Sequence, residues 1–129
     1  MRYLLDTHAL LWSLTDPSKL GKGAREVISS RKNSLAVSAA SAWEISTKHR
    51  LDRLPEADVL LRSYSRHLER LGAERLPITD EHALVAGSLG WEHRDPFDRM
   101  LVAQAIIESM PILSRDATIR DYPGVRVIW

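Results

Sequence analysis

The sequence predicts an α/β domain in which helices flank a mostly parallel central sheet. Three observations support this prediction. Short apolar runs typical of strands alternate with longer runs whose apolar residues recur at helical spacing. The chain has 129 residues, of which 44% are hydrophobic, which suits one domain with one core. No linker, repeat or low-complexity segment divides it, so we expect a single domain over residues 1–129.

Five short runs are expected to form the strands of this sheet. They are RYLL (2–5), SLAVS (34–38), ERLPI (74–78), PILS (111–114) and VRVIW (125–129). Parallel strands need long crossover connections, usually helices, so the alternation of the two kinds of run favours parallel pairing. Ligands bind such sheets beyond the carboxyl ends of the strands, where the first candidates for a functional site should lie.

The stretches between these runs predict six helices. They cover HALLWSL (8–14), AREVISS (24–30), AASAWEISTKH (39–49), and residues 56–72, 79–90 and 96–110. Gly72 is a typical helix stop, and Thr79 is a candidate N-cap with Glu81 just inside the helix. Asp95 followed by Pro96 is typical of a helix start, since proline is favoured at the first helical position.

Composition excludes several classes of protein. The chain has no cysteine, which rules out disulfides and thiolate metal sites. Its 18 basic and 17 acidic residues nearly balance, so any surface that attracts nucleic acid must be local. No apolar run approaches the roughly 20 residues of a membrane span, and the first strand begins too early for a signal peptide. We therefore expect a cytoplasmic protein without a membrane partner.

Two acidic residues directly follow expected strands. Asp6 comes after the first strand, and Asp116 comes just after PILS, the fourth. Taken singly, each is better explained as a helix cap or a turn residue than as a functional group. Their shared position at strand ends is what makes them candidates for a site.

Two further acidic residues lie on expected helices. Asp98 falls in the first turn of a helix that is apolar on nearly all sides, where a carboxylate needs a partner or water. Asp95 is three residues earlier and could form a capping-box-like pair with it. Glu44 lies too deep in its helix to be a cap, and its simpler interpretation is a solvent-facing pair with Lys48.

The four carboxylates form a stronger argument together. Strand ends and the starts of the following helices share one edge of a parallel sheet, so all four should face one crevice. Clustered carboxylates repel one another, and a hard divalent cation such as Mg²⁺ or Mn²⁺ removes that conflict. Such a site activates water and neutralises a phosphate. The predicted metal ligands and catalytic residues are Asp6, Glu44, Asp98 and Asp116.

Four segments, in order along essentially the whole chain, resemble a known family. LLDTHALLW, SAASAWEISTK, HRDPFDRMLVAQAI and ILSRD are similar to PIN-domain nucleases, specifically the VapC-type toxins of bacterial toxin–antitoxin pairs. The resemblance implies a three-layer α/β fold, an RNA substrate, a VapB-type antitoxin partner and a homodimer. The family's acidic residues fall on Asp6, Glu44, Asp98 and Asp116. Asp95 belongs to a DPFDR form found in a subset, and we assign it a supporting role.

The leading functional prediction is a Mg²⁺- or Mn²⁺-dependent endoribonuclease that acts as a toxin. Asp6 and Asp98 would bind the metal directly, while Glu44 or Asp116 would orient or deprotonate the attacking water. Thr7 matches the small hydroxyl residue that commonly follows the family's first acid, and it either holds a metal-bound water or caps the helix.

Three alternatives stay open at this point. A haloacid-dehalogenase-like phosphatase would use Asp6 as nucleophile, but such enzymes usually need a second aspartate two positions later, where His8 stands, and a later lysine. A non-toxin PIN-type RNA-processing nuclease would use the same acids. A binding module without catalysis is disfavoured because all four acids are present.

Other residues of chemical interest are given structural roles. The five histidines have no zinc-like spacing, and His8 faces either the site or the first helix. Trp12 and Trp43 are expected in the core or an interface, since their neighbours are apolar. A basic cluster after Glu44 suits a helix end, with contact to an RNA backbone as the alternative. Its members are Lys48, His49, Arg50 and Arg53.

Overall fold

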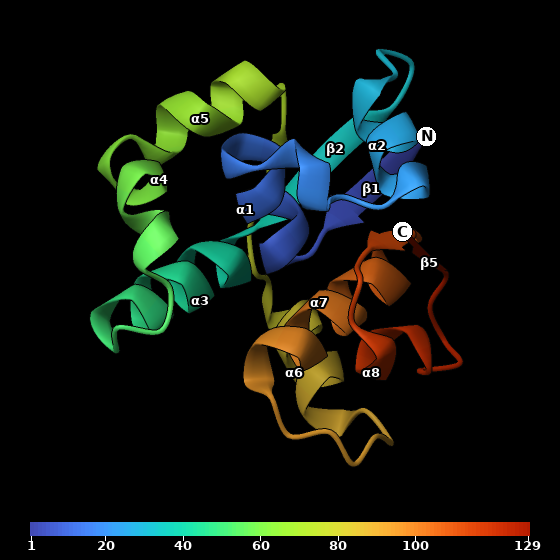
Figure 1. Ribbon diagram of the computed structural model, residues 1–129. Coiled ribbons are helices and arrows are strands. Elements are labelled where there is room, and N and C mark those ends of the chain that lie inside the picture. The colour runs from blue at the N-terminus through green and yellow to red at the C-terminus, as the bar shows by residue number, and fades with distance from the viewer.

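The computed structural model describes all 129 residues and contains one five-stranded sheet (Figure 1). The spatial order of the strands is β3-β2-β1-β4-β5, and every neighbouring pair is parallel. The predicted parallel sheet is therefore confirmed, although its outer strands are shorter than expected. The strands are β1 (Arg2–Leu5), β2 (Ser34–Ser38), β3 (Glu74–Leu76), β4 (Ile112–Leu113) and β5 (Val127–Ile128).

Eight helices connect and cover the strands. They are α1 (Thr7–Thr15), α2 (Lys22–Ser29), α3 (Ala39–Arg50), α4 (Asp58–Arg62), α5 (Tyr64–Leu71), α6 (Asp80–Ser88), α7 (Pro96–Ile107) and α8 (Ala117–Arg120). Short 3₁₀ turns lie at Pro17–Lys19 and Pro55–Ala57. None of the helices combines the length and the apolar character that crossing a lipid bilayer would require.

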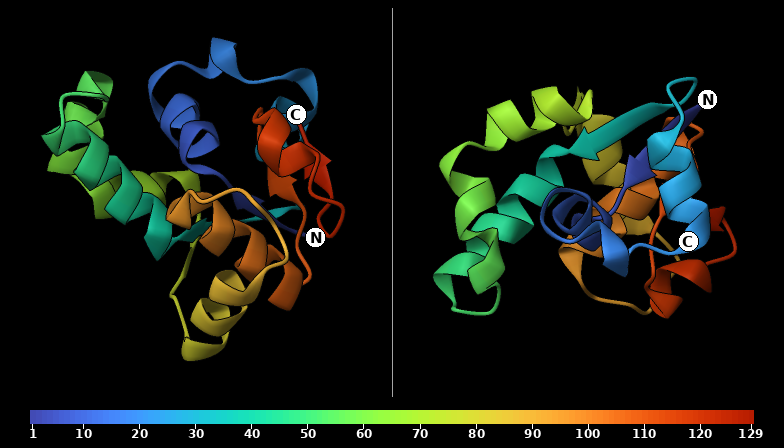
Figure 2. Two further views of the ribbon diagram at one scale, coloured as in Figure 1. Left: turned by 90° about the horizontal axis from the view of Figure 1, so that it is seen from below. Right: turned by 45° about the horizontal axis from the view of Figure 1, so that its top comes forward.

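The sheet lies between two helical layers, as the three-layer prediction requires (Figures 1 and 2). Successive side chains of a strand point to opposite faces. Leu5 of β1 therefore joins a core with residues of α1 to α5, while Leu4 joins a second core with residues of α7 and α8. The strands are apolar on both faces because helices cover both of them.

The stretch over 56–72 is not the single helix that its pattern predicts. It begins with a 3₁₀ turn and forms two helices, α4 and α5, that are separated at Ser63, where φ is −145° and ψ is 46°. A straight helix of this length would extend about 25 Å. The bend allows Leu60 and Leu68 to reach the same core. The stop at Gly72 is confirmed, since it adopts a left-handed conformation with φ 69°.

Other helix ends follow the sequence closely. Thr79 caps α6, and Asp95 caps α7 with Pro96 at its first position. Helix α7 ends at Ile107 rather than at residue 110, because Ser109 turns to φ 54°. The short helix α8 was not predicted, and it begins where Asp116 acts as its cap.

Candidate active site

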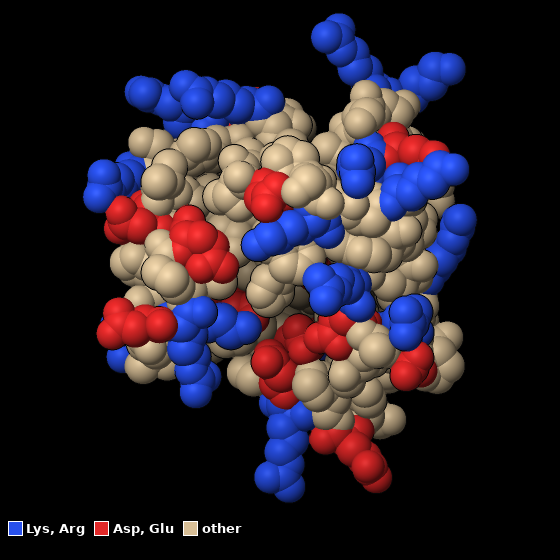
Figure 3. All heavy atoms as spheres, viewed as in Figure 1, with Lys and Arg blue, Asp and Glu red and all other residues tan.

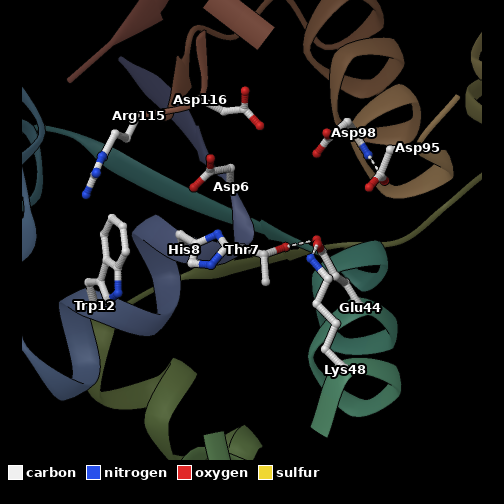
Figure 4. Close-up of a pocket in the computed structure, with 10 residues that line it drawn as sticks. All are labelled: Asp6, Thr7, His8, Trp12, Glu44, Lys48, Asp95, Asp98, Arg115 and Asp116. Atoms are coloured by element: carbon white, nitrogen blue, oxygen red, sulfur yellow. Dashed lines mark hydrogen bonds and ion pairs between the residues drawn. The ribbon is translucent and has the colours of Figure 1, made fainter. Parts of the chain in front are cut away.

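A cavity of about 390 Å³ opens at the carboxyl edge of the sheet. The four predicted acids all line it, together with six other residues (Figure 4). The lining residues are Asp6, Thr7, His8, Trp12, Glu44, Lys48, Asp95, Asp98, Arg115 and Asp116. The space-filling view shows a hollow on this face, with acidic side chains on one side and basic ones on the other (Figure 3). The sheet topology thus brings together the residues that the sequence singled out.

Asp6 lies at the bottom of this cavity, between the end of β1 and the start of α1. Its backbone N–H donates to the carbonyl of Leu113 at 3.1 Å, and its Oδ1 accepts from the N–H of Ala9 at 2.8 Å. Asp6 as a whole residue is 6% exposed. Burial raises the pKa of Asp6 to about 6, and the charges of Glu44 and Asp116 act in the same direction. Asp6 is therefore a helix cap and a cavity residue at once.

Glu44 is buried, so the solvent-facing interpretation was wrong. The residue is 4% exposed because α3 packs against α1. Thr7 Oγ1 donates to Glu44 Oε1 at 2.5 Å, and Lys48 forms an ion pair with Oε2, as the i, i+4 spacing predicted. Thr7 does not cap α1, because Asp6 has that role. Two donors thus fix the Glu44 carboxylate toward the cavity (Figure 4).

Asp98 faces the cavity from the first turn of α7. Its Oδ2 lies 2.7 Å from Nε2 of His93. Burial raises the pKa of Asp98 to about 6, and the charges of Asp95, Glu44 and Asp116 reinforce the shift against the opposing contact with His93. No sequence pattern distinguishes His93 from the other four histidines, because only the folded loop brings it to Asp98.

The capping-box-like pair of Asp95 and Asp98 is only half formed. Asp95 Oδ1 accepts from the N–H groups of Phe97 at 2.9 Å and Asp98 at 3.1 Å. The Asp98 side chain does not reach back to the cap, since it contacts His93 instead. Asp95 nevertheless lines the cavity, which agrees with a supporting position.

Asp116 occupies the most exposed position of the four acids, at the start of α8. Its Oδ1 accepts from the N–H of Thr118 at 2.8 Å, and its own N–H donates to Ser114 Oγ at 3.0 Å. The cap that its sequence position suggested is therefore present. The same residue also lines the cavity, so the two interpretations are compatible.

Arg99 shapes the site without lining it, and it was not among the residues predicted from the sequence. Its guanidinium donates to five backbone carbonyls. The acceptors are Ala86 at 3.0 Å, Gly87 at 3.4 Å, Leu89 at 2.9 Å, Trp91 at 2.7 Å and His93 at 3.0 Å. These bonds tie the last turn of α6 and the loop between α6 and α7, which carries His93 and Asp95, to the start of α7. No sequence pattern identifies an arginine whose partners are all main-chain atoms.

Trp12 and Trp43 have different surroundings. Trp12 packs partly against the core and also lines the cavity. Trp43 is 60% exposed, so it does not belong to the core, and its ring lies edge-to-face with Phe97 at a centroid distance of 4.8 Å. His8, whose direction the sequence left open, faces the cavity.

Only one member of the basic cluster belongs to the cavity. Lys48 lines it, whereas His49 lies 3.5 Å from Asp58, and Arg50 and Arg53 are exposed at the helix end. The structural interpretation of the cluster therefore fits His49, Arg50 and Arg53.

The donor set of the cavity fits a hard divalent cation. It consists of carboxylate oxygens from five acidic residues with imidazole nitrogens nearby, and no thiolate. The raised pKa of Asp6 and of Asp98 is the electrostatic strain that a cation would relieve. Ligand atoms of His93, Asp95 and Asp98 lie within 4.8 Å of one another, whereas no three of the four predicted acids approach so closely. The predicted acids thus surround the cavity rather than form one tight cluster.

Comparisons with known proteins place this geometry in a family. The model of the PIN domain family matches residues 3–125. VapBC2 from Rickettsia felis, solved with a DNA fragment from its promoter, is similar in structure with a TM-score of 0.63 and 15% identity, over 98% of this chain and 97% of the other. FitAcB from Neisseria gonorrhoeae gives a TM-score of 0.63 and 19% identity, over 97% and 95% of the two chains.

PAE2754 from Pyrobaculum aerophilum gives a TM-score of 0.55 and 20% identity, over 98% of this chain and 83% of the other. No curated protein is significantly similar in sequence. At these identities the solved structures show a shared fold. The family model spans nearly the whole sequence, including all four acids at the cavity, and the chain belongs to the PIN domain family.

Proposed function

We propose that the chain is a metal-dependent endoribonuclease that acts as the toxin of a VapBC-type toxin–antitoxin pair. PIN domains are nucleases, and the chain belongs to this family. The observation that carries the proposal is the convergence of Asp6, Glu44, Asp98 and Asp116 on one cavity. Buried carboxylates repel one another, and a cation bound between them would offset this repulsion and attract the phosphate of a substrate.

Asp6 and Asp98 are proposed to hold the metal, because burial leaves their charge poorly compensated by the protein. A bound Mg²⁺ or Mn²⁺ would supply an acidified water and a positive charge for the phosphate. Thr7 and Lys48 hold Glu44 in a fixed orientation, which suits a ligand or an orienting group. Asp116 is more exposed, and its Oδ2 makes no hydrogen bond within the protein, so it is the better acceptor for a water proton.

Structural likeness to VapBC2 and FitAcB supports the proposed antitoxin partner. The homodimer is proposed from the sequence resemblance to VapC-type toxins alone. An antitoxin arginine would fit the acidic cavity, since a guanidinium can bind a carboxylate through two parallel hydrogen bonds. A toxin that cleaves cellular RNA and is silenced by such a partner acts in the cytoplasm, which is our proposed location. The phosphatase alternative has lost its support because the matched family is a nuclease family.

The test of catalysis uses purified protein and a mixture of cellular RNAs. Cleavage should stop in chelator and return with Mg²⁺ or Mn²⁺. Asp6→Asn and Asp98→Asn should each lower the rate by about a thousandfold or more, since asparagine keeps the shape but loses the charge that binds the cation. The control is Asp52→Asn, an exposed aspartate outside the cavity. Full cleavage in chelator, or by both cavity variants, would rule out the metal mechanism.

The test of the toxin role uses bacterial growth. Expression of the chain alone should slow growth, expression of Asp98→Asn should not, and an antitoxin encoded beside the gene should restore growth. A non-toxin RNA-processing nuclease would cleave RNA in the first assay without arresting growth. Normal growth during high expression of active protein would therefore decide for that alternative.

A further inference from the structure

We propose that Arg115 and Lys19, gathered at the indole ring of Trp12, form a subsite for a phosphate of the RNA strand beside the phosphate that is cleaved. The inference rests on the proposed nuclease function and concerns how the substrate is held. It adds a binding role for three residues that the acidic centre does not use.

Both cations of this subsite lie near the indole ring of Trp12. The guanidinium carbon of Arg115 lies 5.7 Å from the centre of the Trp12 ring, and Nζ of Lys19 lies 6.0 Å from it. Both are within the range of a cation–π interaction. The ring is itself held by contacts with His8 at 5.2 Å and Trp129 at 5.8 Å. Figure 4 shows Arg115 and Trp12 at one end of the cavity, with Glu44 and Lys48 at the other.

The charges at this end of the cavity are uncompensated. Lys48, the other basic residue of the lining, is already paired with Glu44. Arg115 and Lys19 make no ion pair, and their side chains make no hydrogen bond. Each of these two cations is therefore free to bind an anion that approaches the Trp12 ring. A phosphate diester is the anion that an approaching RNA strand supplies.

The same contacts argue against a base-stacking site at Trp12. The ring already has two cations as neighbours, together with His8 tilted at 46° and Trp129 in a T-shaped arrangement at 62°. A base would have to displace one of these groups in order to stack. A guanidinium instead offers a fork of donors that matches two oxygens of a phosphate. We therefore assign the subsite to the backbone of a single strand, without preference for a particular base.

The first measurement is steady-state cleavage of a single-stranded fluorogenic oligoribonucleotide in Mg²⁺. Arg115→Gln should raise KM by roughly tenfold, the size of one charge-assisted contact, with little change in kcat. Lys19→Gln should raise KM less, because Lys19, unlike Arg115, does not line the cavity and its ammonium lacks the two-pronged donor geometry of a guanidinium. Arg66→Gln is the matched control, since Arg66 is exposed, outside the cavity and without an ion pair. A fall in kcat at unchanged KM would overturn the subsite.

Trp12 is treated as a positioning residue and needs its own variants. Trp12→Phe keeps a ring for the cations and should change KM only slightly. Trp12→Leu removes the ring and should raise KM toward the Arg115→Gln value, although both cations remain. Because Trp12 also packs against the core, melting curves accompany each variant. Unchanged KM in a folded Trp12→Leu protein would overturn the positioning role.

The second measurement separates this inference from the nuclease proposal. Binding of the same oligonucleotide is followed by fluorescence anisotropy in chelator at several salt concentrations. Each lost phosphate contact should reduce the salt slope of the binding constant by about 0.7. If the wild type does not cleave RNA, the nuclease proposal fails, while the slope still tests the subsite. If the wild type cleaves but Arg115→Gln matches Arg66→Gln in both slope and KM, the subsite is wrong.

Discussion

Asp98 and Arg99 are neighbours in the first turns of α7, yet they meet opposite environments. Asp98 faces the cavity, where its side chain is 15% exposed and its one strong partner is His93. Burial and the nearby carboxylates raise its pKa to about 6. Arg99 faces the end of α6 and the loop between α6 and α7, where two and three backbone carbonyls respectively accept its hydrogen bonds.

The comparison distinguishes a charge that the protein itself satisfies from a charge that it leaves partly unsatisfied. The partners of Arg99 are all within the chain, so its charge is compensated before any ligand arrives. Asp98 is compensated incompletely, and the remaining charge is available to a cation. The start of α7 thus carries Arg99, which organises the loop, next to Asp98, which we propose to bind a cation. The two depend on each other, since the loop that Arg99 holds delivers His93 to Asp98.

The largest expected effect on stability comes from removing the compensated charge. Arg99→Ala leaves five carbonyls without their donor, and we expect a loss of roughly 2 to 4 kcal/mol in the free energy of unfolding. Cleavage should fall as well, because His93 and Asp95 lose their positions. Urea denaturation and RNA cleavage measure the two effects.

Arg94→Ala is the control for Arg99→Ala. Arg94 lies in the same loop, is exposed, and makes no hydrogen bond or ion pair through its side chain. Its removal should change stability by less than about 0.5 kcal/mol. Equal losses in the two variants would mean that net charge, and not the carbonyl contacts of Arg99, stabilises the loop.

The next effect has the opposite sign and depends on pH. Asp98 has a folded pKa of about 6 against an ordinary value of 3.8, so the native state binds a proton more readily than the unfolded state. Its charge therefore destabilises the metal-free protein fully above about pH 6, and this cost disappears below about pH 4. In chelator at pH 8, Asp98→Asn should be more stable than the wild type by about 1 to 3 kcal/mol.

Melting curves from pH 4 to pH 8 check this prediction. The gap between Asp98→Asn and the wild type should widen from about pH 4 to about pH 6 and stay nearly constant above that. Asp52→Asn, which removes an exposed charge outside the cavity, should track the wild type throughout. A variant that is less stable than the wild type at pH 8 would show that Asp98 mainly supports the start of α7.

Much of the molecule could be predicted because its signals are local. The alternation of strands and helices gave the parallel sheet, and the caps at Thr79 and Asp95 gave two helix starts. The four acids were found because parallel topology brings strand ends to one edge of the sheet. The break at Ser63 was not predicted, because the apolar residues on both sides of it keep helical spacing. The break lets the two helices follow the curved surface of the core.

What the sequence could not supply are contacts between segments. Arg99 binds only main-chain carbonyls, and such partners leave no pattern in the residue types. Trp12 gathers Lys19 and Arg115 from opposite parts of the chain. Glu44 looked like a surface ion pair because the i, i+4 spacing to Lys48 is the same in a buried helix face as in an exposed one.

The smallest expected effect concerns Mg²⁺, which should close the gap between wild type and Asp98→Asn. A cation that binds only the folded site stabilises it by mass action, by about 1.4 kcal/mol at ten times its dissociation constant. The wild type should gain this amount at pH 8, and Asp98→Asn should gain less because one proposed ligand has lost its charge.

Matched melting curves in chelator and in Mg²⁺, at equal ionic strength, measure the difference. On this proposal Mg²⁺ would bind where the protein leaves the charge of Asp98 uncompensated, and Arg94→Ala should respond as the wild type does. Equal gains in the wild type and Asp98→Asn would place the cation elsewhere and remove the contrast between Asp98 and Arg99.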